Sequence, residues 1–62
     1  MQLRHAKKLH NGDEVLDKET GESIKVLSVS FHSVATLKSD YVVIEGVGEK
    51  QGYREWNHRS VR

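Results

Sequence analysis

The residues with the clearest chemical potential in this 62-residue chain are basic side chains near its two ends. Two lysines lie near the N-terminus, and three arginines lie near the C-terminus around a single tryptophan. Lysine and arginine neutralise backbone phosphates, and an aromatic ring can stack on a base. The sequence therefore predicts a nucleic-acid-binding site made of Lys7, Lys8, Arg54, Trp56, Arg59 and Arg62.

The distribution of charge supports this interpretation. The net charge is only +1, but residues 1–10 carry +3, residues 50–62 carry +3 and residues 11–49 carry −5. If the two ends meet in the folded protein, they form one basic face opposite an acidic one. The alternative is that the charges only keep a small protein soluble. In that case Trp56 fills the core, as the scarcity of other large side chains favours, and the arginines form a solvated rim.

A second functional class uses the acidic middle of the chain. A protein with a small hydrophobic core can gain stability by pairing with a second copy or with a larger protein. Acidic side chains near turns would then dock a basic partner or mimic phosphate charge. The candidates for this surface are Glu19, Glu22, Glu45 and Glu49. On this hypothesis the chain is a protein-interaction or inhibitor module, which uses its acidic face or an exposed strand edge, and phages and mobile elements often encode such modules.

The sequence gives little support for catalysis or for metal binding. There is no cysteine, and the serines lack a nucleophile-elbow motif. A domain of this length offers little pocket to raise the pKa of a carboxylate. The histidines are scattered without the spacing of a metal site, at His5, His10, His32 and His58. We therefore expect no enzyme, no cofactor and no bound metal.

Length and composition restrict the architecture to one domain spanning residues 1–62. A chain this short buries only ~60% of the surface that its unfolded form exposes. No apolar run approaches the ~20 residues that a membrane span needs. The N-terminal segment has no apolar signal region. We expect a cytoplasmic protein without membrane contact.

The clearest local signal is a β-hairpin that begins near Val15. Gly21 suits the left-handed backbone position that closes a three-residue loop, here residues 19–21. In that register Lys18 faces Glu22, and Leu16 faces Ile24. The expected strands of this hairpin are residues 14–17 and 24–31.

The second of these strands changes its apolar face part of the way along. Ile24 and Val26 share one face, whereas Leu27 and Val29 share the other, which predicts a bulge or bend near residues 26–27. Further strands are expected at residues 41–47 and 53–58, with a turn at 38–40, a tight turn at 57–60 and a last short strand at Val61. Residues 1–9 fit either a helix or a strand.

Four or five short strands with frequent turn signals favour a small antiparallel all-β barrel. Val43 is expected to face outward or towards a partner, and if it is exposed beside Tyr41 and Val47, the three form an association surface for a homodimer. The expected core is Val15, Leu16, Ile24, Val26, Leu27, Val29, Val42, Ile44 and Trp56, with Phe31 near one edge.

Two segments resemble Src-homology-3-like (SH3-like) barrels of bacterial or phage type. Residues 9–15, Leu-His-Asn-Gly-Asp-Glu-Val, look like the turn that enters the first core strand of these barrels. Gly52-Tyr53 and residues 57–61 are similar to the last strands, where a single 3₁₀ turn separates strands four and five. The resemblance implies a five-stranded SH3-like barrel that binds nucleic acid or protein. The aromatic opening and tandem tryptophan of proline-binding members are missing, so a polyproline groove is not expected.

Overall fold

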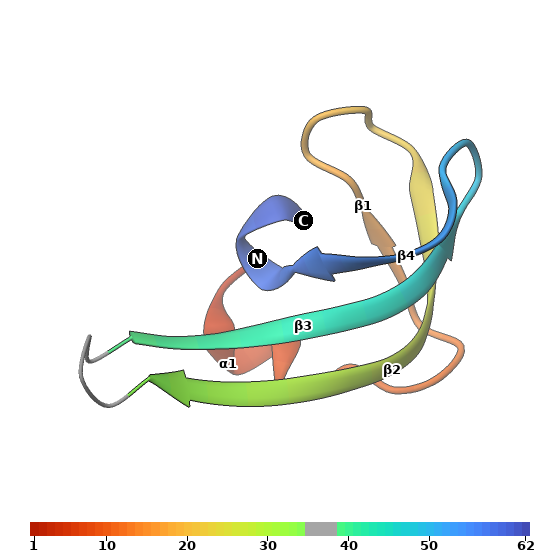
Figure 1. Ribbon diagram of the computed structural model, residues 1–62. Coiled ribbons are helices and arrows are strands. Elements are labelled where there is room, and N and C mark those ends of the chain that lie inside the picture. Colours follow the sequence, from red (N-terminus) through yellow and green to blue (C-terminus); the bar gives the residue numbers. More distant parts are fainter. Residues whose placement is uncertain (35–38) are drawn as a thin grey trace.

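Four antiparallel strands form one curved sheet in the order β1-β2-β3-β4 (Figure 1). The computed structural model describes residues 1–34 and 39–62. The prediction of a mostly β protein is confirmed. Within those residues the sheet is not closed into a barrel by hydrogen bonds. The elements in chain order are α1 (Leu3–Ala6), β1 (Glu14–Leu16), β2 (Ser23–Val34), β3 (Ser39–Gly48), β4 (Gly52–Asn57) and the 3₁₀ helix η2 (His58–Ser60).

The C-terminal residues lie alongside β1. Asp17 and Val61 form a single antiparallel bridge. The Lys18 N–H donates to the Ser60 carbonyl at 3.0 Å, and the Arg62 N–H donates to the Leu16 carbonyl at 2.8 Å. The expected tight turn before Val61 is confirmed as η2, and the expected last strand is a single bridge.

The predicted irregularity in β2 is confirmed as a shift of register between Val26 and Ser28. Before it, residues 23–25 pair with β1, while Val26 exchanges backbone hydrogen bonds with Gly12 and Asp13. After it, β2 continues with β3 as its paired neighbour. One strand therefore serves two parts of the curved sheet, as Figure 1 shows.

The predicted register of the first hairpin is wrong by one residue. Val15 faces Ile24 and Leu16 faces Ser23, so the connection spans residues 17–22 and Leu16 points to solvent with 44% of its surface exposed. Gly21 does adopt the expected positive φ, +76°. The loop is longer than predicted because acidic residues at both its ends turn inward and make hydrogen bonds.

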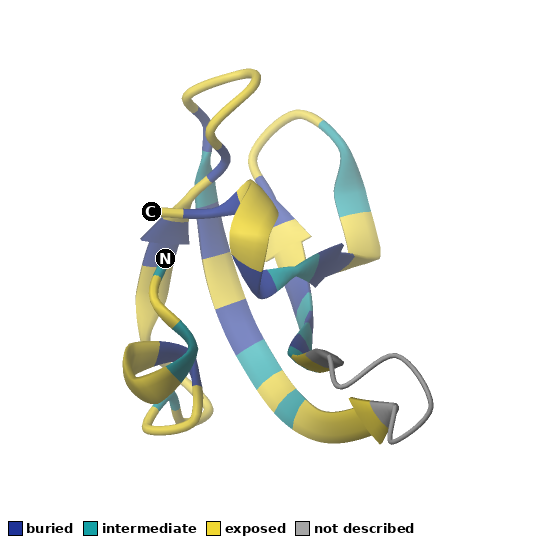
Figure 2. Cartoon of the chain, turned by 90° about the vertical axis from the view of Figure 1, so that its left-hand side faces the viewer, coloured by how far each residue is buried: buried dark blue, intermediate teal, exposed yellow. Residues whose placement is uncertain are grey.

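Buried positions alternate with more exposed ones along β2 and β3 (Figure 2), so the core lies on one face of the sheet, its inner face. Leu27 and Val29 are only half-buried, and Phe31 is 50% exposed near one end of the sheet. Two small core residues, one in α1 and one at the C-terminus, were not predicted. The buried apolar residues are Ala6, Val15, Ile24, Val26, Val42, Ile44, Trp56 and Val61.

The N-terminal segment is a short helix that packs beside β3 and η2. Ala6 is fully buried, and Leu3 and Leu9 pack partly buried against the core. The Met1 amino group donates a hydrogen bond to the Val61 carbonyl, so the two ends of the chain meet. In the part of the chain that the structure describes, no helix is long and apolar enough to cross a membrane.

The outer face of the sheet carries the expected association residues. Tyr41 and Val43 are half-buried there, and Val47 is 43% exposed. The turn expected at residues 38–40 lies partly outside the described residues, and its last two positions belong to β3.

Candidate functional site

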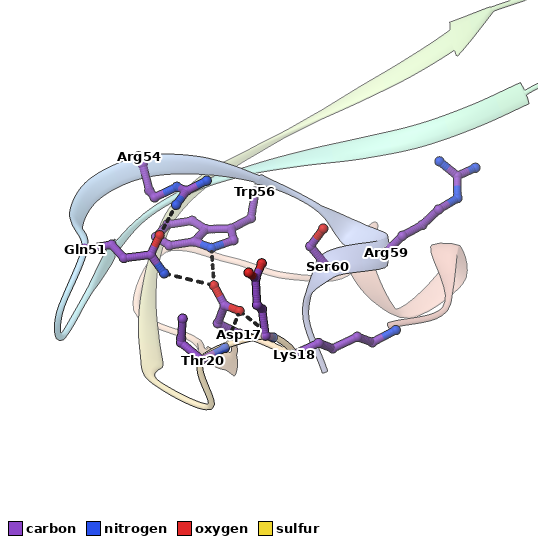
Figure 3. A pocket seen from close by; sticks show the side chains of 9 residues that line it. Asp17, Lys18, Thr20, Gln51, Arg54, Trp56, Arg59 and Ser60 are labelled. Carbon is purple, nitrogen blue, oxygen red and sulfur yellow. Dashed lines mark hydrogen bonds between the residues drawn. The ribbon is translucent and has the colours of Figure 1, made fainter.

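An open pocket of about 510 Å³ lies where three segments of the chain converge (Figure 3). They are the loop after β1, the β3–β4 turn with β4, and η2. Backbone hydrogen bonds between residues 16–18 and 60–62 hold the first and third segments together. The pocket is lined by Asp17, Lys18, Glu19, Thr20, Gln51, Arg54, Trp56, Arg59 and Ser60.

Asp17 forms the base of this pocket, where its side chain is only 6% exposed. Its Oδ1 accepts the N–H groups of Glu19 and Thr20 at 2.7 and 3.0 Å. Its Oδ2 accepts the indole N–H of Trp56 at 2.9 Å and the Gln51 amide at 3.1 Å. Hydrogen bonds from the Thr20 N–H and then the Trp56 indole lower the Asp17 pKa to about 2, against the opposing effect of desolvation. The carboxylate therefore stays ionised and fully hydrogen-bonded at neutral pH.

Glu22 is a second buried carboxylate, 3% exposed, at the other end of the same loop. Its Oε1 accepts the N–H groups of Lys50 and Gln51, both at 3.1 Å. Its Oε2 accepts the Gln51 amide at 2.7 Å and the Thr20 hydroxyl at 2.9 Å. The Gln51 side chain is the largest cause of the lowering of the Glu22 pKa to about 2. Gln51 thus joins both carboxylates and ties the β3–β4 turn to the loop after β1.

Trp56 lies in the core and is 4% exposed, which confirms the core interpretation of this residue. The Arg54 guanidinium lies over its ring at 5.1 Å from the ring centre, within cation–π range. Arg54 also donates to the Gln51 side-chain oxygen. The ring therefore supports the Arg54 side chain, and little of its own surface is left for stacking on a base.

Three cations surround the pocket, against the carboxylates of Asp17 and Glu19. Figure 3 shows Arg54 over the tryptophan, while Lys18 and Arg59 extend away from the ring. The Arg59 guanidinium donates to the Asp40 carbonyl at 3.2 Å. Because Asp17 already accepts four hydrogen bonds, the groups left to meet a ligand are predominantly cationic. The arrangement is suited to binding an anion.

Three of the predicted nucleic-acid-binding residues line this pocket, and three lie outside it. Arg54, Trp56 and Arg59 line the pocket, whereas the other predicted residues do not. The Lys7 ammonium lies 4.3 Å from the centre of the Phe31 ring. Lys8 and Arg62 are exposed, near α1 and beside Val61 respectively.

Six of the nine pocket residues are absent from the predicted nucleic-acid site: Asp17, Lys18, Glu19, Thr20, Gln51 and Ser60. Lys18 was interpreted as the cross-strand partner of Glu22, although its position beside Asp17 places it at the rim. Asp17 and Gln51 carried no sequence signal, because an acid or an amide near a turn is ordinarily exposed.

The predicted acidic surface is wrong at Glu22, which is buried. Glu45 is half-buried on the outer face of the sheet, where it accepts hydrogen bonds from Tyr53 at 3.0 Å and Ser28 at 3.3 Å. Glu19 and Glu49 are exposed.

His58 is buried beneath the 3₁₀ helix rather than displayed for a ligand. Its Nδ1 accepts the Val42 N–H at 3.1 Å. Desolvation, followed by the positive charge of Arg59, lowers its pKa. Across residues 1–34 and 39–62, no cluster of three or more His, Cys, Asp or Glu side chains could hold a metal ion.

Comparison with protein-family models, with curated proteins and with solved structures gave no match to this chain.

Proposed function

We propose that this protein is a small nucleic-acid-binding module that holds phosphates along a surface formed by its two basic ends. The observation that carries the proposal is the meeting of those ends. The Met1 amino group donates to the Val61 carbonyl, and α1 lies beside η2. Segments that each carry +3 therefore contribute to neighbouring surface, which attracts a polyanion.

The pocket supplies the first part of this surface. Lys18, Arg54 and Arg59 come from three different segments, so together they can contact a bent or extended phosphate backbone. Lys7 and Lys8, which follow α1, supply a second group of cations outside the pocket, with Lys7 over Phe31 of β2. Arginine and lysine at these positions contact phosphates rather than base edges. We therefore expect the binding to depend little on the nucleotide sequence.

We also propose that residues 60–62 act as the fifth strand of an SH3-like arrangement. The order of the four strands, the bulge in β2, the 3₁₀ turn and the bridge between Asp17 and Val61 all support it. In this arrangement the pocket lies beside the contact between the first and last strands.

Fluorescence anisotropy with labelled single- and double-stranded DNA and RNA tests the proposed function. At ~0.05 M salt and micromolar protein we expect binding, because non-specific affinity is already measurable under such conditions. Arg54→Ala, Arg59→Ala and a double Lys7/Lys8→Ala change should each weaken binding. The slope of log affinity against log salt should fall by roughly one unit for each phosphate that the variant no longer neutralises.

The matched control is Lys25→Ala, which removes the same charge from the outer face of β2, where Lys25 is exposed. It should leave both affinity and salt slope nearly unchanged. Absence of binding to all four nucleic acids would refute the proposal. An equal loss of affinity with Lys25→Ala would show that only net charge matters and would remove the proposed site.

A further inference from the structure

The outer edge of β2 is unpaired over most of its length. β1 pairs only with residues 23–25, and Gly12 and Asp13 bond only to Val26. The sheet order places β3 on the other side of β2. Within the described part of the chain, residues 27–33 therefore have a strand on one side only. In Figure 1 this stretch runs along the β2–β3 hairpin towards its grey connection.

Apart from the bulge at its beginning and Lys7, whose ammonium lies over Phe31, this edge lacks the features that normally prevent strand pairing. Edge strands are usually protected by charged side chains, proline or short length. Residues 27–33, Leu-Ser-Val-Ser-Phe-His-Ser, contain no lysine, arginine, aspartate, glutamate or proline, although 31% of the chain is charged. The opposite edge strand, β4, carries Arg54 and Glu55. Phe31, on the unprotected edge, is also 50% exposed.

The side chains of this edge alternate between two faces. Val29 and Phe31 lie on the inner face, opposite the buried Ile44 and Val42 of β3. Ser28, Ser30 and His32 lie between them in the sequence and are exposed, so they occupy the outer face.

We propose that a second copy of this chain pairs antiparallel with this edge, centred on Ser30, so that the two sheets become continuous. In that register each Phe31 faces Val29 of the other copy, and each Ser28 faces His32. Aromatic and β-branched residues are favourable cross-strand partners, and burial of the half-exposed phenyl ring adds to the stabilisation. Over residues 28–32 the strand is therefore self-complementary, apolar against apolar on one face and polar against polar on the other.

The absence of charge on the edge favours this occupant over others. Residues 27–33 offer no cation for a phosphate backbone and no charge to select a charged peptide. Within residues 27–33 an identical strand meets no like charge, although the Lys7 ammonium lies over Phe31. The edge lies outside the pocket, and Ser30, the position that the test changes, is not part of the proposed nucleic-acid surface.

A charged residue introduced at the centre of the strand pairing tests the proposed dimer. Position 30 faces itself in the proposed dimer, so Ser30→Lys and Ser30→Asp each bring two like charges together. Sedimentation velocity from about 1 µM to about 1 mM should show the unchanged protein as a dimer at the upper end. Each variant alone should dimerise more weakly, by roughly tenfold or more. An equimolar mixture of the two should restore the dimer, because opposite charges then meet.

Tyr53→Lys and Tyr53→Asp on β4 are the matched controls, since Tyr53 is exposed on the other edge strand. They should leave dimerisation unchanged, and far-ultraviolet circular dichroism should confirm that all four variants are folded. The rescue by mixing separates a register effect from misfolding. A protein that stays monomeric over the whole range overturns the proposal. Ser30 variants that dimerise as strongly as the unchanged protein would also overturn it. An equimolar mixture of the two Ser30 variants that remains monomeric would do the same.

Discussion

The environment of His58 requires a neutral imidazole. Its Nδ1 accepts a hydrogen bond from the Val42 N–H, and a protonated ring has no lone pair to accept it. The charged groups that lower its pKa are all cationic: Arg59, the amino terminus and Lys18. A protonated His58 would therefore combine desolvation, repulsion and the loss of a buried hydrogen bond.

Stability should consequently fall as the pH drops below the ordinary histidine pKa of 6.5. The folded protein binds this proton less readily than the unfolded chain, so its stability is lost as pH falls from 6.5 towards the lowered pKa. Urea titrations between pH 7.5 and 5 should show this decrease, and His58→Gln should reduce it. The Met1 amino group, whose pKa is lowered from 8.0 by desolvation, contributes a loss in the same direction that His58→Gln leaves in place. His5→Gln, at an exposed position, should retain the whole decrease. Protonation of the Asp17 and Glu22 carboxylates lowers stability in a separate pH range, below about pH 4.5.

Among the elements, the loop at residues 17–22 departs most from its sequence expectation. The strands on either side and the positive φ of Gly21 could be predicted, because apolar alternation and glycine carry those signals. The inward turn of Asp17 and Glu22 could not. It depends on donors from Gln51 and Trp56, which lie far away in the sequence. The local sequence pattern determines that a hairpin forms here, but hydrogen-bond donors far away in the sequence determine its register.

Two glycines near this loop should respond differently to substitution. A Cβ at Gly48 would overlap the Glu22 Oε1 and lie 3.4 Å from the Trp56 ring, so Gly48→Ala must displace the buried carboxylate. We expect a decrease of about 2–3 kcal/mol in the free energy of unfolding, larger than that for Gly21→Ala. At Gly21, φ is +76° but nothing lies within 4 Å of an added Cβ.

Gly21→Ala should therefore cost only about 1 kcal/mol, from backbone conformation alone, while the β-branched Gly21→Val should cost more. Denaturant unfolding of the three variants measures these differences. Equal destabilisation by Gly48→Ala and Gly21→Ala would contradict the close approach of Gly48 to Glu22.

For the whole molecule, the sequence predicted the mostly β class, the bulge in β2 and most of the buried positions. Ala6 and Val61 were missed because a small residue in an ambiguous segment and a residue near the C-terminus show no periodicity. Both are fully buried because α1 and the C-terminal segment meet over the sheet. The basic character of the two ends was visible in the sequence. Their proximity depends on contacts between residues far apart, which periodicity does not encode.

The bridge between Asp17 and Val61 has a consequence for the order of folding. It joins residues from opposite parts of the chain, so its formation closes a long loop, whereas β2, β3 and β4 are separated by only a few residues in the sequence. We expect β2–β3–β4 to be structured in the transition state, with the bridge at Val61 formed afterwards.

Chevron analysis of two core variants can test this order. Val61→Ala should mainly accelerate unfolding, with a φ-value near 0, and Ile44→Val should mainly slow refolding. The reverse pattern would mean that closure between the chain ends nucleates the fold.

If closure does come last, native molecules can open the bridge at Val61 transiently while the three-stranded sheet persists. The amide hydrogens of Lys18 and Arg62, which donate across this contact, would then exchange with solvent sooner than those of β3.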